Sequence, residues 1–133
     1  MRLFYHKDDK EVTTWFLQER DVAISMTSFF DQVPSQQAIQ ALEDTTVAYF
    51  TYDELQNLYK QFPELNLVGR SLTEQYYKIW NEQFHATKMQ TAVERYQWFL
   101  NHRADLLLRV PAKYIASYLG ITEVTFSKIR SRK

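Results

Sequence analysis

The C-terminal third of the chain is dominated by one stretch, IASYLGITEVTFSKIR at residues 115–130. Apolar residues at fixed spacing on both sides of Gly120 predict two short helices joined by a tight turn. Glycine at this point supplies the left-handed backbone that other residues adopt only at a cost. Thr122 then suits the cap position of the second helix, because its hydroxyl can accept from the free amides of the first turn.

Seven positions of this stretch meet the requirements of two closely crossing helices. Two such helices need apolar residues on their inner faces, one small residue where they cross and glycine at the turn. In chain order these residues are Ile115, Ala116, Leu119, Gly120, Ile121, Phe126 and Ile129. An ordinary helical hairpin needs fewer of these features, so the pattern favours a helix-turn-helix that binds double-stranded DNA.

The outward face of the second predicted helix, residues 122–131, holds the side chains expected to contact DNA. These are Thr122, Glu123, Val124, Ser127, Lys128, Arg130, Ser131 and Arg132, with Lys133 beside them. Lys128 suits a base edge or a phosphate, and Glu123 can accept from a cytosine amino group. The basic residues at the end suit phosphates, which position a protein without reporting the sequence.

The net charge of zero conceals an uneven distribution along the chain. Residues 1–87 carry 13 Asp and Glu against 7 Lys and Arg, whereas residues 88–133 carry 9 Lys and Arg against 3 Asp and Glu. Only the C-terminal part therefore has a field suited to a polyanion. A basic tail kept for solubility explains the same distribution equally well, so charge alone does not decide between them.

Composition limits the classes of protein to consider. In 133 residues, 45% are hydrophobic and 16% aromatic, which is enough to build a core. The chain has no cysteine, no apolar run long enough to span a membrane and no signal-peptide pattern at its start. We therefore expect a cytoplasmic protein without disulfides and without membrane contact.

Upstream of residue 104 the sequence predicts strands followed by helices, an α+β arrangement. Strands are expected at 2–6, 12–17, 37–42 and 46–50, with a loop and a short helical turn at 25–35. Helices are expected from Thr51 or Tyr52 to the residues before Pro63, from about 64 to 86, and from 88 or 91 to 102.

These stretches together resemble the Crp/Fnr transcription regulators, closest to the branch common in Bacteroidetes. The resemblance is carried by residues 115–122 and 126–130, by Pro34, Ser35, Ile39 and the stretch ALEDT at 41–45, by FPE at 62–64, and by ERY at 94–96 with RVP at 109–111. It implies part of a cyclic-nucleotide-binding-like β-roll over 1–62, a long dimerisation helix over 63–87 and a helix-turn-helix domain over 88–133.

The resemblance also implies a homodimer that binds a palindromic operator, with Leu65, Val68, Leu72, Tyr76 and Ile79 along the dimer seam. An internal-packing role explains that stripe as well. Family members carry the first half of the roll before the equivalent of Arg2, so Met1 is expected to begin within a domain. Many also have a β-wing, which here would have to be formed by residues 106–110 or be absent.

The effector pocket departs from the cyclic-AMP-binding pattern of that family. Its equivalents are Ser25, Met26, Gln36 and Gln37, and this region holds neither the arginine that pairs with the phosphate nor the glutamate that binds the ribose. A buried phosphate without a cation is costly. The sequence therefore predicts no bound cyclic nucleotide or other cofactor and leaves any small-molecule effector unidentified.

Enzymatic and metal-binding functions find no support in the sequence. His6, His85 and His102 have no metal-ligand spacing, and Gly69 and Gly120 alone form no phosphate-binding loop. No nucleophile with an acid–base partner is apparent. The alternative to a DNA-binding regulator is a sensor or interaction module of the same fold with little DNA affinity and little salt dependence.

Overall fold

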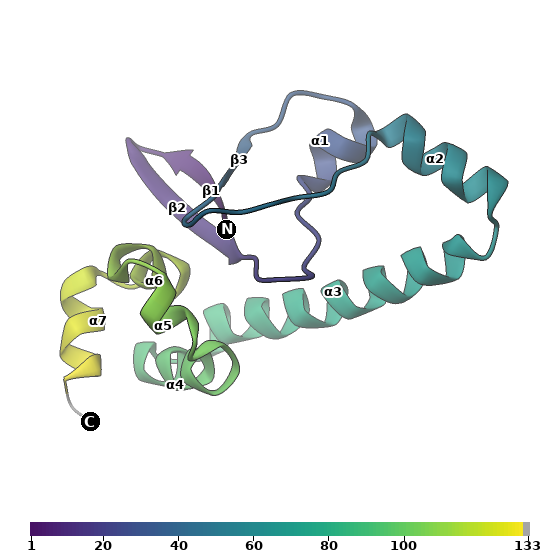
Figure 1. Cartoon of the computed structure of the whole chain (residues 1–133). Coiled ribbons are helices and arrows are strands. Elements are labelled where there is room, and N and C mark those ends of the chain that lie inside the picture. The colour runs from purple at the N-terminus through teal and green to yellow at the C-terminus, as the bar shows by residue number, and fades with distance from the viewer. Residues whose placement is uncertain (132–133) are drawn as a thin grey trace. The chain divides into compact units, whose positions relative to one another are not determined.

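The computed structural model describes residues 1–131 and is drawn in Figure 1. These residues divide into two compact units. One unit joins residues 1–45 to the C-terminal segment that begins at Gln90, and the other comprises residues 46–89. The described residues form a three-stranded antiparallel sheet and seven helices. The expected α+β class is therefore confirmed.

The sheet is built on a hairpin near the N-terminus. Its strands are β1 (Arg2–Lys7), β2 (Lys10–Phe16) and β3 (Gln37–Gln40), in the order β2-β1-β3. Asp8 and Asp9 form the hairpin turn with φ of 49° and 59°. Two consecutive positive φ angles match the right-handed twist of the strands, and aspartate tolerates them better than most residues. The predicted hairpin and its Asp-rich turn are confirmed.

The predicted fourth strand at 46–50 is wrong. This segment has no regular structure, and Val47, Tyr49 and Phe50 have exposed fractions of 59%, 81% and 58%. Its β-branched and aromatic residues suit a strand, but a strand forms only where a neighbouring edge offers backbone partners. The short helical turn expected before β3 is present as α1 (Met26–Asp31).

The second unit consists of the two helices α2 (Tyr52–Gln61) and α3 (Leu65–Met89) with the segment that precedes them. Thr51 caps α2 through a capping box with Glu54. Of the two predicted starts, Thr51 is therefore the cap and Tyr52 is the first helical residue. Of residues 46–89, all of them described, only Ala86 is buried. No helix in residues 1–131 is both long and apolar enough to cross a membrane.

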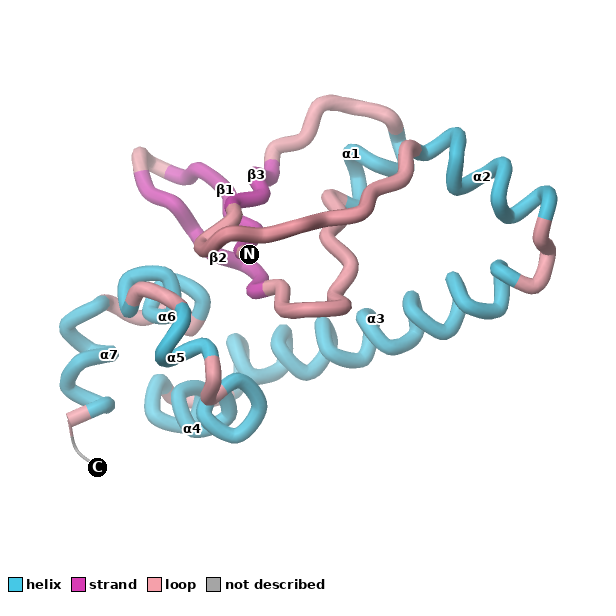
Figure 2. The backbone as a smooth tube through the Cα atoms, viewed as in Figure 1, coloured by secondary structure: helices cyan, strands magenta, loops and turns pink. Residues whose placement is uncertain are grey.

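Helices make up most of the C-terminal segment, which is drawn largely in cyan in Figure 2. They are α4 (Ala92–Arg103), α5 (Leu106–Arg109), α6 (Ala112–Tyr118) and α7 (Glu123–Arg130). Of the two alternatives for a β-wing, formation by residues 106–110 is wrong, because α5 occupies this segment. Leu106 is buried in the core, and its carbonyl accepts from the amide of Val110, so a helical turn satisfies the backbone locally.

The first unit has one core, which the sheet and the C-terminal helices share. Its buried members are Phe16, Tyr96, Phe99, Leu106, Ile115, Ala116, Leu119 and Phe126. Phe16 at the end of β2 meets the ring of Tyr118 with centroids 5.2 Å apart, and Tyr96 of α4 meets Phe126 of α7 edge to face at 5.6 Å. The shared core is what positions α6 and α7.

Candidate nucleic-acid interface

The turn between α6 and α7 has the hydrogen bonding of a glycine-terminated helix. Gly120 has φ of 65°, its amide donates to Ser117, and the amide of Ile121 donates to Ala116, each at 3.0 Å. This pair of bonds is the Schellman arrangement, which uses the last carbonyls of a helix and requires the left-handed residue between them. The left-handed conformation predicted for Gly120 is confirmed.

The inner faces of α6 and α7 are buried as the sequence predicted. Ile115, Ala116, Leu119 and Phe126 have exposed fractions of 3% or less, while Ile121 and Ile129 are half-buried against the same core. Thr122 caps α7 by accepting from the amide of Thr125 at 3.1 Å. The predicted cap is therefore also confirmed, and α7 is held firmly on its inner side.

The outer side of α7 is open to solvent. Glu123, Val124, Ser127, Lys128, Arg130 and Ser131 are all exposed, and so is the capping residue Thr122. The structure therefore brings these predicted residues together on one uncovered face. Arg132 and Lys133, the last two residues assigned to DNA contact, lie outside the described residues.

The side of α6 opposite its core face is covered by β2. The amide of Thr13 donates to the Ser117 hydroxyl at 3.0 Å, and this hydroxyl donates to the carbonyl of Glu11 at 3.2 Å. The buried guanidinium of Arg2 lies 3.5 Å from the centre of the Tyr114 ring. The sheet thus supports α6 from behind and leaves the outer face of α7 uncovered.

Three of the arginines that give the C-terminal segment its positive charge are engaged within the protein. Arg95 donates to the carbonyls of Leu119 and Gln90, each at 2.8 Å, and thereby holds the end of α6. Arg103 donates to the carbonyl of Phe16 and to Gln18. Arg109 is the third, and it lies in a larger polar cluster.

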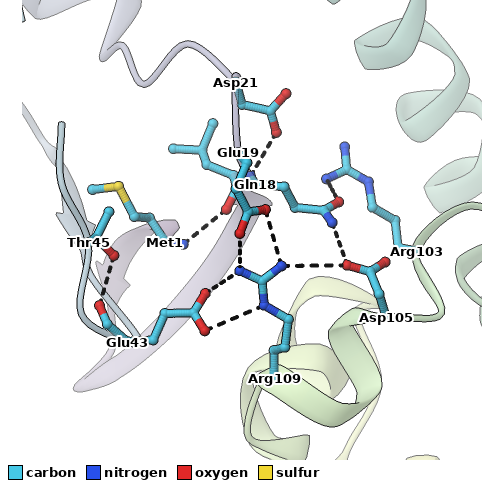
Figure 3. A network of polar contacts seen from close by, with 10 residues as sticks. Met1, Gln18, Glu19, Asp21, Glu43, Thr45, Arg103, Asp105 and Arg109 are labelled. Atoms are coloured by element: carbon cyan, nitrogen blue, oxygen red, sulfur yellow. Dashed lines mark hydrogen bonds and ion pairs between the residues drawn. The ribbon is translucent and has the colours of Figure 1, made fainter. Parts of the chain in front are cut away.

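Arg109 joins the C-terminal helices to two loops of the sheet (Figure 3). Its guanidinium donates to Glu19, which follows β2, and to Glu43, which follows β3, with Asp105 at 3.9 Å. The pKa of Glu19 is lowered to about 2, mainly by the hydrogen bond from Arg109 and to a smaller extent by a backbone hydrogen bond. Arg109 is thus engaged by carboxylates of both loops, and it ties them to α5.

Three described cations of the C-terminal helices remain free. Within residues 90–131, the side chains of Lys113, Lys128 and Arg130 form no hydrogen bond or ion pair, and all three are exposed. The sequence placed Lys128 and Arg130 on the DNA-facing side and did not single out Lys113. It also gave no sign that Arg95, Arg103 and Arg109 are engaged, because their partners are up to 90 positions away.

The predicted effector-pocket equivalents are spread over the loop around α1 and the start of β3. Ser25 and Ser35 share a hydrogen bond of 2.8 Å, and Gln37 donates to the Thr14 hydroxyl at 3.1 Å. Met26 is 56% exposed and Gln36 is also exposed. None of these four predicted side chains brings a cation to the loop.

The predicted dimer seam lies on α3. Val68 and Leu72 have exposed fractions of 54% and 39%, whereas Leu65, Tyr76 and Ile79 are half-buried. A second apolar row on the same helix holds exposed, stacked rings at Tyr77, Trp80 and Phe84, with successive centroids 6.1 and 5.5 Å apart. The sequence-based seam did not include this aromatic row.

No protein-family model matches the sequence, and no curated protein is significantly similar to it.

Proposed function

We propose that the protein is a DNA-binding transcription regulator of the Crp/Fnr type, which binds a palindromic operator as a homodimer through the outer face of α7. The observation that carries the proposal is the α6–α7 pair. Its inner faces are buried, its turn depends on Gly120, and its outer face is polar, partly basic and uncovered. A helix held in this way fits the major groove of DNA.

The homodimer is proposed from the exposed side chains of α3. The second unit buries almost nothing of its own, although α3 displays Val68, Leu72 and an aromatic row. Helices of soluble proteins gain most of their stability from covering such faces, and contiguous exposed apolar surface marks an interaction site. A second copy of the chain would also supply the second recognition helix that a palindromic site requires.

The test is a fluorescence-anisotropy titration of labelled duplexes taken from upstream of the protein's own gene, at several salt concentrations. We expect tight binding of two chains per site, with the logarithm of affinity falling linearly with the logarithm of salt. A folded protein that shows no binding in dilute salt would contradict the proposal.

Lys128→Ala gives a residue-level test of the same surface. It is expected to weaken operator binding by about 1–3 kcal/mol if Lys128 contacts a base, and to relax discrimination at that position. The matched control is Lys60→Ala, which removes an exposed lysine from α2, outside the α6–α7 pair. Equal operator affinity for the Lys128→Ala and wild-type proteins would remove Lys128 from the contact surface.

The second candidate is a sensor or interaction module that binds little DNA. It is favoured by the engagement of Arg95, Arg103 and Arg109 in internal bonds, which reduces the positive charge available to a polyanion. This candidate predicts weak DNA binding with a shallow salt dependence, and the same titration separates it from the first.

A further inference from the structure

We propose that Lys113 on α6 contacts a DNA phosphate and forms a second anchoring point in addition to the outer face of α7. This inference rests on the proposed function, because it adds a residue on another helix to the same DNA complex. The contacts expected from the sequence all lie at residues 122–133. A lysine on the preceding helix widens the surface and gives it a part that is independent of base sequence.

The position of Lys113 follows from how α6 is packed. At about 100° per residue, Ile115, Ala116 and Leu119 lie on one side of the helix and Tyr114, Ser117 and Tyr118 on the other. The first side enters the core, and the second carries the contacts with the sheet through Ser117 and Tyr114. Lys113 is attached to the helix on the flank between these two sides and is exposed, and its Nζ leans towards Tyr114.

That open flank is the one available to the DNA backbone. When the second helix of such a pair enters the major groove, the first helix crosses the phosphates at the edge of the groove. The covered side of α6 is unable to approach DNA because β2 occupies it. An exposed lysine on the remaining flank supplies the compact point charge that suits a phosphate oxygen.

The side chain of Lys113 is also held in place. Its Nζ lies 4.8 Å from the centre of the Tyr114 ring, and the guanidinium of Arg2 lies 3.5 Å from the same ring. Arg2 is itself fixed by Glu11, by the Thr13 hydroxyl at 3.1 Å and by Gln40 at 2.7 Å. A cation ordered against a fixed ring loses less side-chain freedom when it binds a phosphate.

The charges around Lys113 leave it free for an external anion. The hydrogen bond from Arg2 is the largest cause of the lowered pKa of Glu11, and the charge of Lys113 is the smallest one. Glu11 therefore pairs with Arg2 in an ion pair, whereas Lys113 has no ion pair within residues 1–131. Together with Lys128 and Arg130, Lys113 completes the set of free cations in the C-terminal helices.

The experiment measures binding of a fluorescein-labelled duplex of mixed sequence to the full chain between about 50 and 200 mM salt. Lys113→Ala is expected to lower the slope of log affinity against log salt by about one unit. Its loss of affinity relative to wild type would then be about three- to fourfold greater at the low salt than at the high salt. The fold-change should be the same on a second, scrambled duplex, because a phosphate contact is independent of base sequence.

Two further variants distinguish a phosphate contact of Lys113 from a purely structural role of this residue. Lys113→Arg keeps the charge and should restore the wild-type slope, and Lys60→Ala should leave the slope unchanged. The unfolding temperature of Lys113→Ala is followed by circular dichroism. A lower unfolding temperature with an unchanged salt slope would overturn the inference, because it would place Lys113 only in packing against Tyr114.

The two levels of proposal fail differently. If wild type shows no salt-dependent binding, the proposed function fails and the phosphate contact fails with it. If wild type binds steeply and Lys113→Ala binds with the same slope, the proposed function stands and only the Lys113 contact is lost.

Discussion

At the scale of single residues, Val124 is the apolar exception on the outer face of α7. It is 63% exposed, whereas its exposed neighbours on this face are polar or charged. In the major groove the matching apolar group is the C5 methyl of thymine. The proposed function therefore assigns Val124 a thymine in each half-site.

The prediction is tested by replacing each thymine of the bound operator with deoxyuridine, which lacks only that methyl group. We expect one thymine position in each half-site at which the deoxyuridine duplex binds wild-type protein about fourfold more weakly than the thymine duplex. This factor corresponds to roughly 0.8 kcal/mol for one buried methyl group. Val124→Ala should bind the two duplexes almost equally. The same deoxyuridine effect in both proteins would show that Val124 does not contact that methyl group.

At the scale of elements, the turn between α6 and α7 depends on one backbone conformation. A Cβ at Gly120 would meet nothing within 4 Å, so a substitution there acts through φ rather than through a clash. Gly120→Ala is expected to cost about 1–2 kcal/mol of unfolding free energy in urea titrations, the price of a left-handed alanine. Gly120→Asn is the matched variant and should cost less, because asparagine tolerates this region. Equal stability of wild type and both variants would contradict the prediction.

Elements were predictable from sequence where their determinants are local. Thr51, Thr91 and Thr122 each cap a helix through an amide three residues ahead, and the Asp8-Asp9 turn sets its own hairpin. The predicted strand at 46–50 failed because strand formation depends on a partner edge elsewhere in the chain. On the candidate interface, the buried faces of α6 and α7 followed from helical periodicity. That Lys113 has no ion pair did not follow from periodicity, because it depends on the sheet packed against α6 and on which other cations are already paired.

At the scale of the whole molecule, the first unit is assembled from the two ends of the chain. Its core needs Phe16 beside Tyr118, and its polar edge needs Arg109 beside Glu19 and Glu43, residues far apart in sequence. The sequence showed the strands and the C-terminal helices separately. It did not show that they pack together, because no local pattern records which distant side chains meet.

The polar edge makes the stability of this unit sensitive to acid. The hydrogen bond that Arg109 donates to the carboxylate of Glu19 lowers the pKa of this group from 4.5 to about 2 in the folded chain. A folded pKa below the unfolded one stabilises the folded state fully above about pH 4.5, and this stabilisation is lost as the pH falls towards 2. Urea titrations of wild type at pH 7, 4.5, 3 and 2 should therefore show stability falling across the lower window, and Glu19→Gln should fall less steeply.

The control for this prediction is a double-mutant cycle. In an Arg109→Gln background the carboxylate of Glu19 has lost the donor that lowers its pKa most, so adding Glu19→Gln should change the slope between pH 4.5 and 2 much less than it does in wild type. At pH 7, Glu19→Gln alone should already be less stable than wild type, because the ion pair is broken while Glu43 still holds Arg109. If Glu19→Gln flattens the acid slope equally with and without Arg109, another group lowers that pKa and the arginine is not what fastens the sheet loops to α5.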